Sequence, residues 1–218
     1  MENKDLKYFE LVKLLNEKWS EELLKKEAHF RGNISSFSLI SLNSKTPEIG
    51  ISKITTEEKA KEELSKFNPK EPERKTPEKS LQAWVILNAI RNDYILPFGK
   101  NLTFITSELA IVLEDNKRIV NDILAIDENN NLVIIELKSI RVNQVKEQAI
   151  KFKAIIESQK DFFGELTKLM TGKSWNGNVK CMVVLPKANG KEQEIPKKYR
   201  DVEEYQYYNK YNFEKRCK

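Results

Sequence analysis

The chain has 218 residues and a net charge of +5; 33% of its residues are charged and 39% are hydrophobic. This length suits one ordinary domain with an appendage. A mean hydropathy of -0.59 and the lack of an apolar run near twenty residues exclude a membrane span. The first residues contain acidic side chains and no cleavage site after an apolar core, so no signal peptide is expected.

Residue usage excludes several classes of protein. The single histidine, His29, excludes nucleases and proteases that need a histidine pair, and it excludes Cys/His zinc fingers. We expect His29 to be a structural or solvated residue in a charged helix. The seven glycines form no phosphate-binding loop, which argues against ATP hydrolysis and dinucleotide redox chemistry. Cys181 and Cys217 have no metal-type spacing and suit a reducing, cytoplasmic location.

Residues 1–70 are predicted to form an N-terminal α+β appendage of unknown role. A helix is expected over residues 4–29, because apolar residues recur there at helical spacing. These are Leu11, Leu15, Trp19 and Leu23. Core packing is the expected purpose of this helix; the alternatives are DNA recognition, a contact with a partner protein, and a homodimer formed through Leu11 and Trp19.

Shorter elements follow the first helix. Two strands are expected at residues 35–42 and 47–54. A second helix over 55–67 opens with a capping box formed by Thr55 and Glu58. Dense charge and prolines then mark a linker over residues 71–77.

Residues 78–218 are predicted to form a second domain. Thr76 can cap its first helix, with Pro77 at the first helical position. Three extended segments, a helix and two further strands are expected at residues 102–113, 118–127, 132–139, 142–158, 178–186 and 201–208. This order predicts an α/β fold with a mixed sheet flanked by helices.

Two strands of this domain carry acidic residues within apolar runs. If the turn between them is Glu128-Asn129-Asn130, Asp127 pairs with Asn131, and counting outward places Asp122 directly opposite Glu136. Directly opposed residues point to the same face, with Cβ atoms about 4.5–5.5 Å apart. A two-residue turn would shift the pairing by one and send Asp122 to the other face.

In the three-residue register, Asp122 and Glu136 face each other with Lys138 one pleat away. Two opposed carboxylates repel, and burying them without compensation is unfavourable. A divalent cation such as Mg²⁺ would relieve the repulsion, and Lys138 could then position or deprotonate a water for phosphodiester hydrolysis. Alternatively, the two acids are exposed strand ends paired with lysines, because Glu-x-Lys recurs elsewhere in this charged chain.

The composite of Asp122, Glu136-Leu137-Lys138 and a following helix with Gln148 resembles the PD-(D/E)xK, or restriction-endonuclease-like, nuclease superfamily. The resemblance spans about residues 77–208 and implies a restriction-endonuclease-like core. Within the superfamily, the chain is similar to the prokaryotic branch that includes mismatch- and branch-cutting DNA endonucleases. It departs from the family pattern in having Asn121, rather than proline, before the aspartate.

Carried over residue by residue, the resemblance implies that Asp122, Glu136 and the backbone carbonyl of Leu137 bind Mg²⁺, for which Mn²⁺ would substitute. Lys138 would orient the attacking water. Gln148 would steady the site from the following helix, with Gln144, one turn earlier, as its rival for that role. Phe152 stands where the family often has a tyrosine.

Two further acids match positions that flank the site in this branch. Glu78 matches an acid on the first helix, although a charge that favours the helix dipole is an equal alternative. Glu108 lies in the first strand and is either a ligand of a second metal or a structural carboxylate. Three basic residues near the site are expected to face a phosphate backbone: Arg141, Lys146 and Lys151.

The sequence therefore predicts a metal-dependent DNA endonuclease with double-stranded or branched DNA as partner, in the cytoplasm and without a membrane. DNA is favoured over RNA by the resemblance alone. The alternatives are a catalytically silent nuclease-fold module that binds nucleic acid or a protein, and a plain α/β protein whose acids are surface residues. The joint presence of Asp122, Glu136 and Lys138 favours the enzyme.

Overall fold

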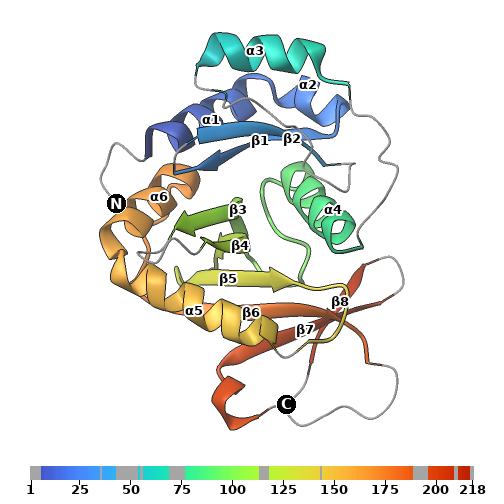
Figure 1. The fold of residues 1–218 in the computed structure, drawn as a ribbon, viewed down its shortest axis with the longest axis vertical. Coiled ribbons are helices and arrows are strands. Elements are labelled where there is room, and N and C mark those ends of the chain that lie inside the picture. The colour runs from blue at the N-terminus through green and yellow to red at the C-terminus, as the bar shows by residue number, and fades with distance from the viewer. Residues whose placement is uncertain are drawn as a thin grey trace.

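The structure, a computed structural model, describes residues 6–34, 36–42, 54, 56–68, 77–112, 118–142, 144–188, 196–208 and 211–216. Its centre is a six-stranded sheet in the order β3-β4-β5-β6-β7-β8, flanked by helices (Figure 1). The pairs β5–β6 and β6–β7 are parallel and the other pairs are antiparallel. The predicted α/β fold with a mixed sheet is confirmed.

The first part of the chain contains α1 (Lys7–Lys18), α2 (Ser20–Lys25), β1 (Ala28–Asn33), β2 (Ser36–Ser41) and α3 (Glu57–Lys66). The single helix predicted over 4–29 is therefore interrupted at Trp19 and ends at Lys25, and its last two residues, Ala28 and His29, belong to β1. β1 and β2 pair along their whole length. Asn16 of α1 receives a hydrogen bond from the Phe30 amide and donates one to the Phe30 carbonyl, both at 2.9 Å. These bonds give both backbone polar groups of Phe30 a partner on α1, and they favour an extended strand at this position.

His29 lies in β1 rather than in a charged helix. Its side chain is buried, and its Nε2 lies 3.4 Å from Nδ2 of Asn16. Burial lowers the pKa of His29 to about 3, and Arg31 adds to this shift. The imidazole is therefore neutral at physiological pH, and its role in this environment is structural.

The helix α3 begins one residue later than predicted. Thr56, not Thr55, is the N-cap, and its hydroxyl accepts a hydrogen bond from the Lys59 amide at 3.3 Å. Thr55 lies outside the described residues. So do most of the strand predicted at 47–54 and residues 71–76 of the predicted linker. Ile54 is described and forms an isolated bridge with Phe37.

The second part contains α4 (Pro77–Arg91), β3 (Thr103–Val112), β4 (Arg118–Ile126), β5 (Leu132–Leu137), α5 (Gln144–Ser158), α6 (Lys160–Thr171), β6 (Val179–Pro186), the 3-10 turn η2 (Lys197–Tyr199), β7 (Val202–Tyr208) and β8 (Asn212–Lys215). Neither α6 nor β8 is among the predicted elements. In the described ranges, no helix has the length and apolar character that a membrane crossing needs.

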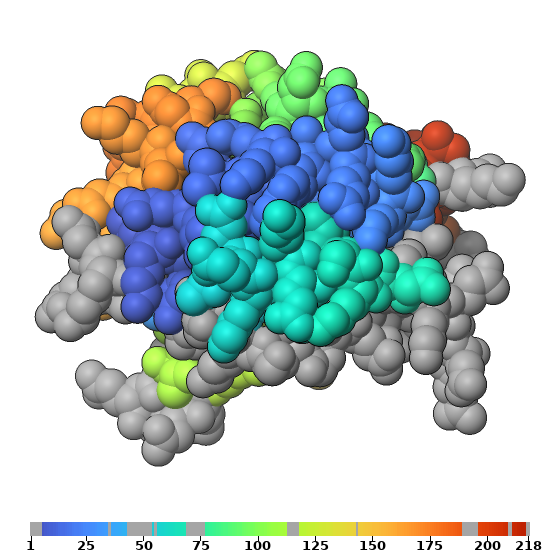
Figure 2. Space-filling view, turned by 90° about the horizontal axis from the view of Figure 1, so that it is seen from above, coloured from blue at the N-terminus to red at the C-terminus, as the bar shows by residue number. Residues whose placement is uncertain are grey.

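Each face of the sheet has its own apolar core. On one face α5 and α6 cover residues such as Leu124 and Ile134, and on the other α4 covers Ile123 and Ile135. The N-terminal elements form a third core, yet Phe9 of α1 joins the first core. These elements close one end of the molecule (Figure 1), and seen from that end they form a continuous surface (Figure 2).

The hairpin between β4 and β5 has the predicted register. Ile123 pairs with Ile135 and Ile126 pairs with Leu132, and the Asp127 amide donates to the Asn131 carbonyl at 3.0 Å. Asn130 takes the left-handed conformation with φ 61°, which asparagine tolerates well. The three-residue turn is thus confirmed, and one rung beyond the Ile123–Ile135 pair it places Asp122 opposite Glu136.

Asp127 holds this turn together. Its Oδ1 accepts hydrogen bonds from the amides of Asn129 and Asn131, both at 2.9 Å, and its Oδ2 lies 2.7 Å from Nζ of Lys180. Burial alone would raise the pKa of Asp127, but Lys180 and Asn131 outweigh burial and lower the pKa.

We expect Asp127→Ala to lower the free energy of unfolding by about 2–3 kcal/mol, because two turn amides lose their acceptor. Urea denaturation at pH 7 measures this loss. Because the pKa is lowered on folding, the contribution of Asp127 is present above the unfolded pKa of about 4 and is lost as pH falls through the lowered value. Asp127→Asn should lose less stability than Asp127→Ala. Equal unfolding curves for Asp127→Ala and the wild type would contradict the role of Asp127 in the turn.

Candidate active site

Asp122 and Glu136 meet at the end of the β4–β5 hairpin that lies away from the turn. Asp122 is 8% exposed and Glu136 is fully buried. The Leu137 amide donates to Oδ2 of Asp122 at 2.8 Å, and Nδ2 of Asn121 donates to Oε1 of Glu136 at 3.2 Å. In the described part of the chain, no group is hydrogen-bonded to the other Glu136 oxygen, Oε2, which is also buried.

The two carboxyl groups perturb each other. Burial raises the pKa of Glu136 to about 9, and the neighbouring Asp122 adds to the shift against Asn121 and Lys138. Burial also raises the pKa of Asp122, although Lys138 and the Leu137 amide oppose it. Without a further cation, the pair therefore holds a proton at neutral pH. This crowding, together with the unbonded Oε2 atom, fits a site for a divalent cation.

Lys138 lies between the carboxylate pair and α4. Its Nζ is 3.1 Å from Oε1 of Glu78 and 3.9 Å from Oδ2 of Asp122. Burial would lower the pKa of Lys138, but Asp122 and Glu78 outweigh it and raise the pKa. Lys138 is therefore a cation that can donate hydrogen bonds, and Glu78 is placed beside it.

Helix α4 also supports the backbone of the site through a residue that the sequence did not single out. Nε2 of Gln82 donates to the Asp122 carbonyl at 3.0 Å, and Gln82 is buried. Gln82 follows Glu78 by four residues, so the two share one helix face. In the sequence, only this four-residue spacing from Glu78 could have indicated that Gln82 lies near the site.

Helix α5 contributes Gln148 rather than Gln144. Nε2 of Gln148 donates to the Val120 carbonyl at 3.0 Å, two residues before Asp122. Gln144 is the first residue of the helix and is exposed. Gln148 thus contacts the β4 backbone and not a carboxylate, which is the geometry of a supporting residue.

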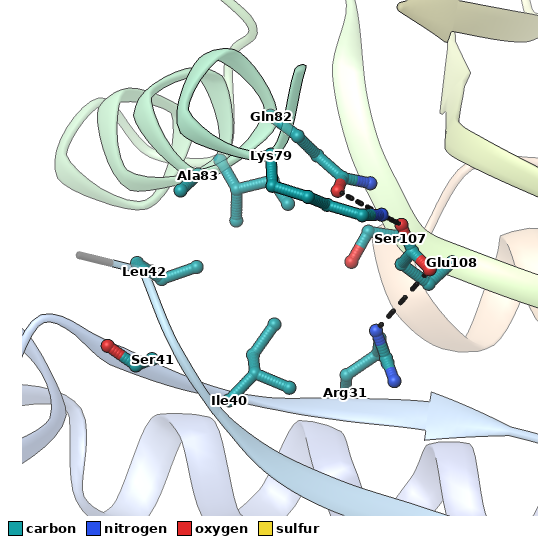
Figure 3. Close-up of a pocket in the computed structure, with 10 residues that line it drawn as sticks. Arg31, Ile40, Ser41, Leu42, Lys79, Gln82, Ala83, Ser107 and Glu108 are labelled. Atoms are coloured by element: carbon teal, nitrogen blue, oxygen red, sulfur yellow. Dashed lines mark hydrogen bonds and ion pairs between the residues drawn. The ribbon is translucent and has the colours of Figure 1, made fainter. Parts of the chain in front are cut away.

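Glu108 stands beside the pair on β3 but is engaged elsewhere. It forms an ion pair with Lys79 of α4, and its Oε2 lies 3.9 Å from Nη1 of Arg31 on β1. Burial would raise the pKa of Glu108, yet Lys79, Gln82 and Arg31 together lower it. Figure 3 shows these side chains around a small cavity, of about 20 Å³, between β2, α4 and β3.

Two of the three basic residues expected to face a phosphate backbone form ion pairs with an acid of the protein itself. Glu204 of β7 is buried and pairs with Arg141 and with Lys146, whose Nζ lies 2.9 Å from Oε2. Arg216 joins them at 3.1 Å. For Lys146, which is 4% exposed at the side chain, the expectation is wrong; Lys151 is exposed. A buried carboxylate is stabilised by ion pairs, and here its partners come from distant segments of the chain. Such pairs cannot be predicted from the spacing of residues along the sequence.

In the described ranges, no group of three or more Asp, Glu, His or Cys side chains is placed to hold a metal ion. The geometry offers a pair of carboxylates, Asp122 and Glu136, with Lys138 beside it. The predicted roles of the Leu137 carbonyl, Glu78 and Glu108 as metal ligands remain predictions.

Comparison with known proteins finds partial similarity to solved structures, which include the following two. One is an EndoMS–double-stranded DNA complex, with 19% identity, a TM-score of 0.32, and coverage of 55% of this chain and 41% of that one. The other is a repair endonuclease from Pyrococcus abyssi, with 17% identity, a TM-score of 0.28, and coverage of 53% and 40%. The matched region thus spans less than half of each neighbour. No protein-family model matches the chain, and no curated protein matches it.

Proposed function

We propose that this protein is a Mg²⁺-dependent DNA endonuclease of the PD-(D/E)xK type. The observation that carries the proposal is the placement of Asp122 against Glu136 on adjacent strands, with the Lys138 ammonium 3.9 Å from Asp122. The burial of two neighbouring acids opposes folding, and a cation bound between them would offset this cost.

Asp122 and Glu136 would hold the ion, with the Leu137 carbonyl and water completing its oxygen ligands. When bound, Mg²⁺ supplies Lewis-acid activation of water and neutralises charge on the scissile phosphate. The reaction would form a bond between the water oxygen and phosphorus and break the bond from phosphorus to one sugar oxygen, which would leave as a hydroxyl with a proton that comes from the water. DNA as the substrate rests on the sequence resemblance.

The other residues of the site hold and orient. Lys138 is protonated, so it orients the attacking water by donating a hydrogen bond, or stabilises negative charge on the phosphate, rather than abstracting a proton. Glu78 fixes the lysine from α4. Gln82 and Gln148 hold the backbone on the two sides of Asp122, at the carbonyls of Asp122 and Val120.

The test is incubation of the purified protein with plasmid, single-stranded and branched DNA, in Mg²⁺ or Mn²⁺ and in EDTA. Cleavage that needs the metal and disappears in Asp122→Asn supports the proposal. Metal-independent cleavage, or cleavage by Asp122→Asn at the wild-type rate, would overturn the site. DNA binding without cleavage in any metal would identify the silent nuclease-fold module instead.

A further inference from the structure

Glu108 extends the carboxylate pair into a row of three acids on neighbouring strands. The pairs Ser107–Ile123 and Leu109–Asn121 flank Glu108 and place it opposite Asp122, which is itself opposite Glu136. Glu108 has φ 53°, in the left-handed region, where a non-glycine residue is strained. A strained acid next to a candidate metal site must be held by its surroundings.

Two cations hold Glu108, and one of them comes from the N-terminal hairpin. Lys79 of α4 pairs with Oε1, and Arg31 of β1 faces Oε2 at 3.9 Å. The side chains are shielded, with exposures of 17% for Arg31 and 16% for Glu108. This shielding makes the charges interact more strongly than they would on an open surface. Figure 3 shows the Glu108 carboxylate between the two cations.

The contact between Arg31 and Glu108 is an ion pair without a hydrogen bond. The separation of 3.9 Å exceeds hydrogen-bond length, and Nη1 of Arg31 is buried with no hydrogen-bond partner in the described residues. The adjoining cavity of about 20 Å³ has room for about one water molecule. The pair therefore acts through charge, and a lysine at position 31 could replace the arginine.

The pair is connected to the carboxylates by α4. Lys79 donates to Oε1 of Gln82 at 3.1 Å, and Gln82 holds the Asp122 carbonyl. Lys79 also follows Glu78, the partner of Lys138. A change in the charge or position of Glu108 is thus felt at Asp122 both directly and through the α4 contacts; the negative charge of Glu108 raises the pKa of Asp122.

We propose that Arg31 is a positioning residue of the candidate metal site. By pairing with Glu108, the N-terminal hairpin holds this third carboxylate away from the Asp122–Glu136 pair and limits the affinity of the pair for a divalent cation. The inference rests on the proposed metal site at Asp122 and Glu136.

The test is a double-mutant cycle on the full chain, read as the Mn²⁺ dissociation constant from titration calorimetry. Arg31→Gln should bind Mn²⁺ more tightly, on the order of fivefold, because Glu108 is released toward the site. Glu108→Gln should bind more weakly, and adding Arg31→Gln to it should have little further effect. Arg31→Lys should bind like the wild type.

A matched control is Arg91→Gln, which breaks another ion pair between α4 and the N-terminal elements, with Glu27. Its Mn²⁺ affinity should be unchanged. Tighter Mn²⁺ binding by Arg31→Gln would also distinguish a positioning role from a general loss of stability, because a loosened fold does not bind the ion more tightly. Arg31→Met can replace Arg31→Gln in the cycle if the latter does not fold.

Two results overturn the inference: Arg31→Gln that binds Mn²⁺ like the wild type, or an equal effect of Arg31→Gln with and without the Glu108 carboxylate. Asp122→Asn separates this failure from failure of the proposed function. If Asp122→Asn abolishes Mn²⁺ binding while Arg31→Gln changes nothing, only the role of Arg31 is lost. If the wild type binds no Mn²⁺, or Asp122→Asn binds it normally, both proposals are overturned.

Discussion

The Glu136→Gln protein should lose DNA cleavage by about 10³-fold and yet, in EDTA at pH 8, unfold at a temperature about 3–6 °C higher than the wild type. The glutamine keeps the size of the side chain and can still accept the hydrogen bond from Asn121. It can also donate to the Asp122 carboxylate without taking up a proton, whereas Glu136 must bind a proton on folding at pH 8. A residue that opposes folding while it serves catalysis gives this combination of effects.

The pH dependence of the unfolding free energy follows from the raised pKa of Glu136. The pKa of Glu136 is raised to about 9, so the folded state keeps a proton that the unfolded chain releases near pH 4.3. The resulting stabilisation is fully present below the unfolded pKa and is lost as pH rises through the folded pKa. In EDTA, the difference in melting temperature between Glu136→Gln and the wild type should therefore grow from pH 5 to pH 9.

Thermal unfolding followed by circular dichroism measures this trend, with Glu157→Gln on the exposed side of α5 as the control. The control should show no pH-dependent difference from the wild type. Mg²⁺ should then stabilise the wild type and not Glu136→Gln, which reduces or reverses the difference. A difference in melting temperature that stays constant with pH would contradict the buried-proton interpretation, and full cleavage activity would remove Glu136 from the site.

The register of the β4–β5 hairpin could be predicted because its causes are local. Side chains alternate along a strand, Asn130 tolerates the left-handed position, and Asp127 can bond to amides two and four residues ahead. With the turn fixed, counting placed Asp122 opposite Glu136. The pairing needed no information from distant segments, which is why the sequence sufficed.

The missed features depend on distant contacts. His29 is the last residue of the range predicted as a helix, but pairing with β2 and the Asn16 bonds to Phe30 make its segment a strand, as tertiary contacts often override local preference. Gln82 and Arg31 are unremarkable in the sequence. They acquire their roles because α4 and β1 pack beside β3 and β4, which no spacing along the chain shows.

The Lys138→Met protein should also lose cleavage, by about 10²–10⁴-fold, but should bind Mn²⁺ at least as tightly as the wild type. Lys138 is a cation 3.9 Å from Asp122, so its removal favours another cation at the carboxylate pair. Methionine keeps much of the apolar stem. Loss of activity without loss of metal binding distinguishes a residue that acts on water or phosphate from one that holds the ion.

The matched control is Lys180→Met on β6, where Lys180 pairs with Asp127 at the turn of the β4–β5 hairpin at 2.7 Å. This variant also removes a lysine that pairs with an acid of the hairpin, and it should cleave DNA at the wild-type rate below its melting temperature. Single-turnover cleavage at saturating Mn²⁺ and calorimetric titration of Mn²⁺ provide the two measurements. If Lys138→Met lost metal binding together with cleavage, Lys138 would be a structural partner of Glu78 and Asp122, and the orientation of water would have to come from another residue.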